Sequence, residues 1–150
     1  MLASANGDVY TGQFRNNRFH GLGKFRKGNG DVFLGHCVDG RAEGVGVLSM
    51  ASGEKYKGSF VRDRRSGKGV AIYPNGCRFA GNWLNGAHHG FGVFSTPGGE
   101  RYVGNWDKGR KHGKGRYVFR NGDFYDGDFS EDKADGYGIY RYGESPRLFP

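Results

Sequence analysis

The chain has 150 residues, and 30 of them are glycine, well above the usual share of about 7%. So much glycine argues against a bundle of long helices, because glycine weakens a helix interior by about 1 kcal/mol per residue, and collagen is excluded because glycine does not recur at every third position. The formal net charge of +8 makes anionic partners one class to consider.

The sequence repeats itself with a period of 23 residues from Gly7 onward. Positions 1, 6, 15 and 17 of every unit are glycine, position 4 is always aromatic, and position 8 is aromatic in every unit except the second, which has Cys37. We therefore predict a lead-in over residues 1–6, six repeats over residues 7–144 and a tail over residues 145–150. The six repeats are 7–29, 30–52, 53–75, 76–98, 99–121 and 122–144.

Each repeat predicts one β-hairpin. Positions 4, 6 and 8 are two apart, so they share one face of an extended strand, and positions 15, 17 and 19 follow the same period. We expect strands over roughly positions 2–9 and 16–21, with a loop between them. Positions 22, 23 and 1, as in Pro74-Asn75-Gly76, suit a three-residue turn that ends in a left-handed glycine. Such a turn pairs position 19 with position 4 of the next repeat, and position 17 with position 6.

The glycines at positions 6 and 17 leave room for aromatic rings to lie flat on the sheet. The predicted fold is all-β: an elongated single-layer antiparallel meander of six tandem 23-residue β-hairpin repeats, held together by rings in place of a second layer. We expect the rings to be used for packing, and the alternative is that some also line a protein-binding groove. The candidate groove residues are Tyr10, Phe14, Phe33, Tyr56, Phe60, Phe79, Trp83, Tyr102, Trp106, Tyr125 and Phe129.

The pattern Tyr-x-Gly-x-Phe/Trp followed by Gly-x-Gly resembles the MORN repeat ("membrane occupation and recognition nexus"), and residues 99–115 match it almost throughout. The resemblance covers residues 7–144. It implies an elongated antiparallel meander that serves as a non-catalytic scaffold at membranes, cilia or cytoskeletal structures. Cys37 departs from the pattern, and we expect it to fill a gap in the core as a small hydrophobic residue. Glu43 and Ser66 stand where His is usual.

The sequence predicts neither catalytic residues nor a cofactor or metal site. Gly-x-Gly pairs such as Gly67 and Gly69 lack the remaining residues of a phosphate-binding loop. The histidines at positions 13 and 14 fall in the expected loops, and no thiolate or carboxylate is spaced to complete a zinc site with them; they are His20, His88, His89 and His112. Cys37 and Cys77 are too few for a disulfide framework, and with no signal peptide we expect a reducing, intracellular setting.

Basic residues recur at position 12, in the expected loop between the two strands of a repeat, and follow at position 13 in two repeats. Along one edge of the ribbon they would form a row of cations able to hold anionic phospholipid head groups, at roughly 1 kcal/mol for each residue near the surface. The alternative is that they keep a solvated edge soluble and unpaired. The candidate anion or lipid contacts are Arg18, Arg41, Arg64, Arg65, Arg110, Lys111 and Lys133.

The face opposite the rings is apolar in the second repeat. A patch of this kind suggests an interface, and the alternative is that sheet curvature or the tail Ser145–Pro150 covers it. The candidate interface residues are Val32, Leu34, Val38, Val45 and Val47. The last repeat is acidic and the one before it basic, which favours a specific protein contact, including pairing with a second copy, over general binding to anionic lipid.

The expected function is therefore that of a non-enzymatic scaffold or adaptor with protein partners of the cytoskeleton or of membranes. We expect a homodimer, because both ends of the sheet expose strand edges, and the ordinary first and last repeats suggest a longer array. The alternative function is recognition of anionic phospholipid through the basic residues, and nucleic acid is a weaker alternative because packing uses the rings. The expected location is the cytoplasm, at the cytoskeleton (a cilium or flagellum included) or the inner face of a membrane.

Overall fold

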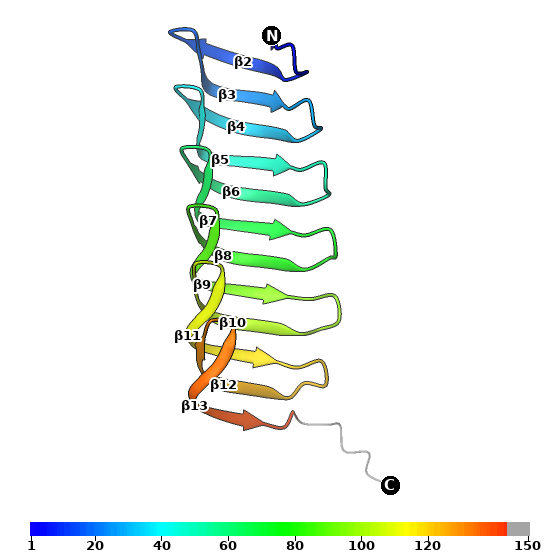
Figure 1. Cartoon of the computed structure of the whole chain (residues 1–150), viewed down its shortest axis with the longest axis vertical. Coiled ribbons are helices and arrows are strands. Elements are labelled where there is room, and N and C mark those ends of the chain that lie inside the picture. The colour runs from blue at the N-terminus through cyan, green and yellow to red at the C-terminus, as the bar shows by residue number, and fades with distance from the viewer. Residues whose placement is uncertain (144–150) are drawn as a thin grey trace.

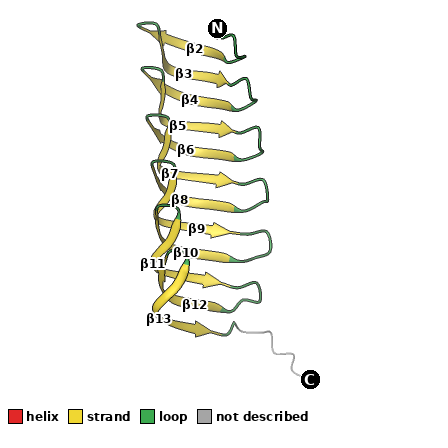
Figure 2. Cartoon of the chain, viewed as in Figure 1, coloured by secondary structure: helices red, strands yellow, loops and turns green. Residues whose placement is uncertain are grey.

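The computed structural model describes residues 1–143 and folds them into one open sheet of 13 antiparallel strands (Figures 1 and 2). Each strand pairs with its neighbours in sequence, so the sheet is an elongated ribbon with the N-terminus at one end and the last strand at the other (Figure 1). The prediction of an all-β antiparallel meander of hairpins is confirmed. The strands are β1 (Leu2–Ala3), β2 (Val9–Arg15), β3 (Arg18–Arg26), β4 (Val32–Val38), β5 (Arg41–Ser49), β6 (Lys55–Val61), β7 (Arg64–Ile72), β8 (Arg78–Leu84), β9 (Ala87–Ser95), β10 (Arg101–Asp107), β11 (Arg110–Val118), β12 (Phe124–Ser130) and β13 (Lys133–Arg141).

The two ends of the chain differ from the expected hairpins. The lead-in contributes the unexpected strand β1, whose Leu2 pairs with Tyr10. The end of the sixth repeat at Glu144 and the tail Ser145–Pro150 lie outside the described residues. Within residues 1–143, no helix of the length and apolar character needed to cross a membrane is found.

The turns that join successive repeats have the predicted three residues. At the first joint, the Gly30 N–H donates a hydrogen bond to the Lys27 carbonyl at 3.0 Å, and Gly30 adopts a left-handed φ of 99° that a side chain would strain. The register that follows is the expected one, with Phe25 opposite Phe33 and Gly23 opposite Gly35. Turn length thus places large side chains opposite one another and glycines opposite one another.

The expected loop within each repeat is wrong, because a two-residue turn takes its place. In the first repeat both Asn16 and Asn17 are left-handed, with φ of 50° and 61°, and β3 begins directly at Arg18. Two consecutive left-handed residues are typical of a type I′ hairpin turn. The turns Asp39-Gly40 and Asn85-Gly86 have the residue types typical of this turn, whereas Arg62-Asp63 does not. Position 12 therefore opens the second strand of every repeat.

The hairpins curl strongly near these two-residue turns (Figure 1). A bulge between Gly12 and Phe14 interrupts the pairing of β2 with β3. Phe14 pairs with Phe19 and lies four residues from Tyr10, about 13 Å along a straight strand. Nevertheless the Phe19 ring stacks on the Tyr10 ring with centroids 3.9 Å apart. The curl therefore folds the end of each hairpin back over its own middle.

The core consists of rings that lie over glycines, as predicted. A Cβ atom added to Gly115 would lie 2.5 Å from Cε2 of Tyr102, too close for any side chain there. Rings at position 8 stand edge-on between two position-4 rings, so that Trp83 lies 5.2 Å from both Tyr56 and Phe79. Edge-to-face packing of this kind adds about 0.5–1.5 kcal/mol per pair beyond the buried area. From Phe33 to Tyr125 these rings form a continuous row that joins each hairpin to the next, and Cys37 interrupts the row between the first and second repeats.

Candidate binding surfaces

Most of the rings proposed for a groove lie in this core. Eight of the eleven are buried, among them Tyr10, Tyr56, Phe79 and Tyr102, which are 0–1% exposed. Phe14 is exposed, and Phe33 and Tyr125 are half-buried. A groove that a partner could reach therefore has only these three of the candidate rings to offer.

A second layer of side chains, from position 13, covers four of the position-4 rings. The imidazole of His88 lies flat on Phe79, with ring centroids 3.7 Å apart. The guanidinium of Arg65 lies 4.8 Å from the centroid of Tyr56, and its Nη1 is 2.6 Å from the Glu54 carboxylate. The remaining covering residues are Phe19 over Tyr10 and Lys111 over Tyr102. Because the hairpins curl, side chains of the sheet itself cover the rings on its inner face.

The histidines expected in loops lie in strands instead: His20 in β3, His88 and His89 in β9, and His112 in β11. Burial, with a contribution from the nearby cation of Arg65, lowers the pKa of His88 to about 4. Its Nε2 lies 2.7 Å from the Tyr73 hydroxyl, so the neutral imidazole belongs to the packing. Residues 1–143 contain no group of three or more His, Cys, Asp or Glu side chains arranged to hold a metal ion.

The candidate basic residues do not form one row. Arg65 and Lys111, at position 13, lie over rings on the inner face, whereas the position-12 cations are exposed at the edge where the hairpins turn. These edge cations are Arg18, Arg41, Arg64, Arg110 and Lys133.

Carboxylates interrupt this edge. Glu43 lines two shallow hollows together with Arg41 and Arg62, and it accepts a hydrogen bond from the Arg62 N–H at 3.0 Å. Further along, Arg110 lies 4.0 Å from the carboxylate of Glu131. Carboxylates therefore accompany the edge cations both in the first three repeats and in the last two.

Acidic side chains of the last repeat form ion pairs with basic side chains of the fifth repeat. Arg116 of β11 bonds the Asp126 carboxylate through Nε at 2.6 Å, which lowers the pKa of Asp126. Lys114 lies 2.7 Å from Asp128. These ion pairs between neighbouring strands neutralise part of the opposite charges of the fifth and sixth repeats. The sequence had predicted that these charges would contact a partner protein or a second copy of the chain.

The apolar residues opposite the rings lie on two adjacent strands, β4 and β5. Leu34 is 50% exposed and faces Val47, which is 37% exposed. Val38 and Val45 are also exposed, whereas Val32 is half-buried. We call Leu34, Val38, Val45 and Val47 the outer patch. The tail that was the alternative cover lies outside the described residues.

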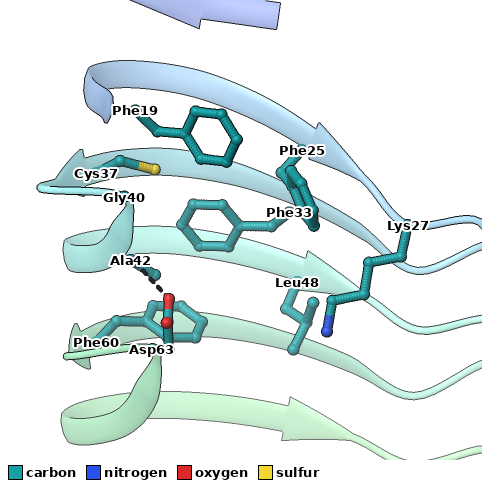
Figure 3. A pocket seen from close by; sticks show the side chains of 10 residues that line it. All are labelled: Phe19, Phe25, Lys27, Phe33, Cys37, Gly40, Ala42, Leu48, Phe60 and Asp63. Carbon is teal, nitrogen blue, oxygen red and sulfur yellow. Dashed lines mark hydrogen bonds between the residues drawn. The ribbon is translucent and has the colours of Figure 1, made fainter. Parts of the chain in front are cut away.

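A cavity of about 330 Å³ opens on the inner face of the second repeat (Figure 3). Its wall is apolar, with Phe19, Phe25, Phe33, Leu48 and Phe60 among the lining residues, and Lys27 and Asp63 lie at opposite sides. Cys37 is buried in the core, as expected for a small hydrophobic residue, and its short side chain leaves space that forms part of the cavity wall. Burial raises the pKa of its thiol, and Asp63 adds to this.

Comparison with known proteins places the chain in a family. The sequence description of the MORN repeat matches six successive segments: residues 10–32, 35–55, 56–78, 79–101, 102–124 and 125–144. The chain belongs to the MORN-repeat family. MORN repeats mediate interactions with proteins and membranes, and the family is not a family of enzymes. Five of the six matched segments begin at the position-4 aromatic residue and the second begins at Gly35, so the family frame differs from the predicted repeat boundaries.

Among solved structures, this MORN-repeat chain is similar to the TCP domain of Drosophila melanogaster SAS-4 (dCPAP), solved in complex with a proline-rich motif of Ana2 (dSTIL). The TM-score is 0.52 at 15% sequence identity, and the match covers 81% of this chain and 67% of that one. At this identity the likeness shows the fold alone. No curated protein matches the chain.

Two features of these surfaces were not predicted from the sequence. Arg62 adds a cation to the edge, and nothing marks it in the sequence because it stands in the two-residue turn. The cavity did have a signal: the second repeat combines Cys37 at position 8 with the small Ala42 at position 13. These two residues predict a cavity only once position 13 is known to lie over the rings.

Proposed function

We propose that this MORN-repeat chain is a non-catalytic scaffold that binds protein partners through its exposed side chains. The observation that carries the proposal is the outer patch, in which four apolar side chains of β4 and β5 are 37–60% exposed. Apolar side chains gathered on one face of a sheet are typical of protein interfaces. The SAS-4 domain, which shares the architecture, was solved with a bound protein motif, and this supports a protein as the class of partner.

The test compares proteins captured by three forms of the tagged chain from its native cells, with quantitative mass spectrometry. The first form is the wild type, and the second replaces Leu34→Lys and Val47→Glu, which face each other and can pair by charge, so that the fold is kept. The control is Phe91→Lys, on the same face of the sheet but outside the patch and 54% exposed. Partners should be lost only from the double variant, and equal recovery by all three forms would contradict binding through the patch.

A second candidate function is recognition of anionic phospholipid. Arg18, Arg41 and Arg64 are exposed along one edge, and Arg62 lies beside them. Flotation with phosphatidylserine vesicles should show binding that disappears at moderate salt and on changing Arg18, Arg41 and Arg64 to Ser. Absence of binding at low salt would remove this candidate.

We further propose that the scaffold self-associates as a homodimer at the cytoskeleton or at the inner face of a membrane. Support comes from β13, which pairs with β12 alone among the described strands and exposes Tyr137 and Ile139. Light scattering should give a mass above the 16.5 kDa of one chain, and a monomer at all concentrations would contradict the dimer. Imaging of the tagged chain tests the location.

A further inference from the structure

The second repeat lacks a side chain that its neighbours possess. In four repeats a residue at position 13 covers the ring at position 4, and the covered rings are 0–1% exposed. The covering residues are Phe19, Arg65, His88 and Lys111. All four carry either a flat group or a long cationic one. In the second repeat this position is Ala42, which is too short to cover a ring.

The consequence is the cavity over Phe33. Phe33 is the equivalent of the four covered rings, yet it is only half-buried. Cys37 enlarges the space, because the other repeats place an aromatic residue at position 8. On the far side, Phe60 stands edge-on to Phe33 at 5.2 Å, as the corresponding ring does elsewhere. The remaining walls are apolar and include Phe19, Phe25 and Leu48 (Figure 3).

The polar residues of the cavity indicate what kind of group fits. In other repeats, the tip of the covering side chain contacts the residue that follows the last strand of the repeat before. The Tyr73 hydroxyl lies 2.7 Å from Nε2 of His88, and Sδ of Met50 lies 3.6 Å from Nη2 of Arg65. In the second repeat this residue is Lys27, which lines the cavity. A lysine here favours a hydrogen-bond acceptor at the tip of the occupant and opposes a cation.

The second repeat has a carboxylate, Asp31, at the position that could pair with a cationic occupant, but Asp31 already accepts other hydrogen bonds. Arg65 pairs with Glu54 at 2.6 Å, and the residue equivalent to Glu54 in the second repeat is Asp31. Asp31 accepts a hydrogen bond from the Ala51 N–H at 2.8 Å and another from the Asn29 side chain at 3.3 Å. Asp63, the carboxylate that lines the cavity, already accepts the Ala42 N–H at 2.7 Å, and Lys27 opposes a second cation, so the second repeat suits a ring better than an arginine or lysine.

We propose that the cavity binds a tyrosine side chain of a partner polypeptide. The ring lies on Phe33 in the place that His88 takes on Phe79, and the phenol oxygen accepts a hydrogen bond from Nζ of Lys27. Asp63, across the cavity from Lys27, accepts the Ala42 N–H through Oδ1 at 2.7 Å, and its second carboxylate oxygen can accept an N–H group from the main chain of the partner (Figure 3). The inference rests on the proposed function in that the partner is a protein, but it concerns a different face from the outer patch.

The probe is N-acetyl-tyrosinamide, titrated into the 15N-labelled chain and followed by NMR. Saturable shifts should centre on the amides of Gly40 and Ala42. N-acetyl-phenylalaninamide, which lacks the acceptor, should bind about fivefold more weakly, the value of one hydrogen bond of about 1 kcal/mol. Lys27→Met, an exposed change at the rim that leaves the core intact, should abolish this preference.

Ala42→Phe restores the missing cover and should eliminate binding. Ala134→Phe is the matched control, since Ala134 holds the same position in the sixth repeat and lies away from the cavity, and it should bind as the wild type does. Shifts centred elsewhere, binding retained by Ala42→Phe, or a tyrosine preference retained by Lys27→Met would each overturn the proposal. Self-association lost on Ala42→Phe would show a second copy of the chain as the occupant and would overturn the choice of a separate partner. None of these outcomes depends on the outer patch, so the scaffold function is tested separately.

Discussion

His88 lies parallel to Phe79, with the two rings inclined by only 4° and their centroids 3.7 Å apart. Its Nδ1 is buried and has no hydrogen-bond partner among the described residues, while Nε2 meets the Tyr73 hydroxyl. The imidazole therefore acts as a flat piece of the core that must stay neutral, which makes the fold sensitive to acid at this position.

Acid should destabilise the sheet through His88. Its pKa is about 4 in the folded chain and about 6.5 in the unfolded one. Between these values the unfolded chain binds the extra proton, so the contribution of His88 is fully present above about pH 6.5 and is lost as the pH falls toward 4. The loss is on the order of 2 kcal/mol once residual solvent access is allowed for. Urea unfolding of wild type and His88→Phe across this pH range measures it as the difference between the two curves. His112→Phe, at an exposed site, is the control, and parallel curves for all three proteins would contradict the prediction.

Adding a methyl group beneath a ring should disrupt the core. Gly115→Ala places its Cβ against the Tyr102 ring, which cannot move because Trp106 and Phe129 stand edge-on to it at 5.1 and 5.0 Å. We expect a loss of about 2–3 kcal/mol in the free energy of unfolding. Lys114→Ala, the exposed neighbour on the opposite face, removes only a surface ion pair with Asp128 and should change it by less than about 1 kcal/mol. Thermal unfolding compares the two, and equal tolerance of both changes would contradict the ring-over-glycine core.

A hydroxyl added to Phe79 should stabilise the fold. The Tyr56 and Tyr102 hydroxyls donate to the carbonyls of Ser59 and Asn105 at 2.8 and 2.9 Å, three residues further on. Phe79→Tyr offers the same hydrogen bond to Asn82 and should add about 1 kcal/mol, while Tyr56→Phe should remove a similar amount. Denaturant unfolding measures both, and a loss of stability in Phe79→Tyr would show that the fourth repeat lacks the space.

The neighbouring residues Arg64 and Arg65 should differ in their contribution to stability. Arg65→Ala removes a guanidinium that lies over Tyr56 and Trp83 and pairs with Glu54, so we expect a loss of about 1–2 kcal/mol in stability. Arg64→Ala removes an exposed edge cation and should leave stability within about 0.5 kcal/mol. Calorimetry of the two variants separates these roles. Similar melting temperatures for both would mean that the cation over the ring contributes nothing.

The sequence by itself determined the repeat, the strand pairing between repeats and the place of the glycines. These features are local: a three-residue turn such as Gly28-Asn29-Gly30 sets the register of β3 against β4, and a ring at Tyr102 requires glycine at Gly115. Only the tertiary structure decided where position 13 lies. The curl of each hairpin brings residues that are distant along the strand over the ring row, so Arg65 covers Tyr56 while Arg64 stays at the edge. For the same reason the cavity over Phe33 could not be read from the pattern, because it arises where a side chain of one curled hairpin is too short to reach a ring.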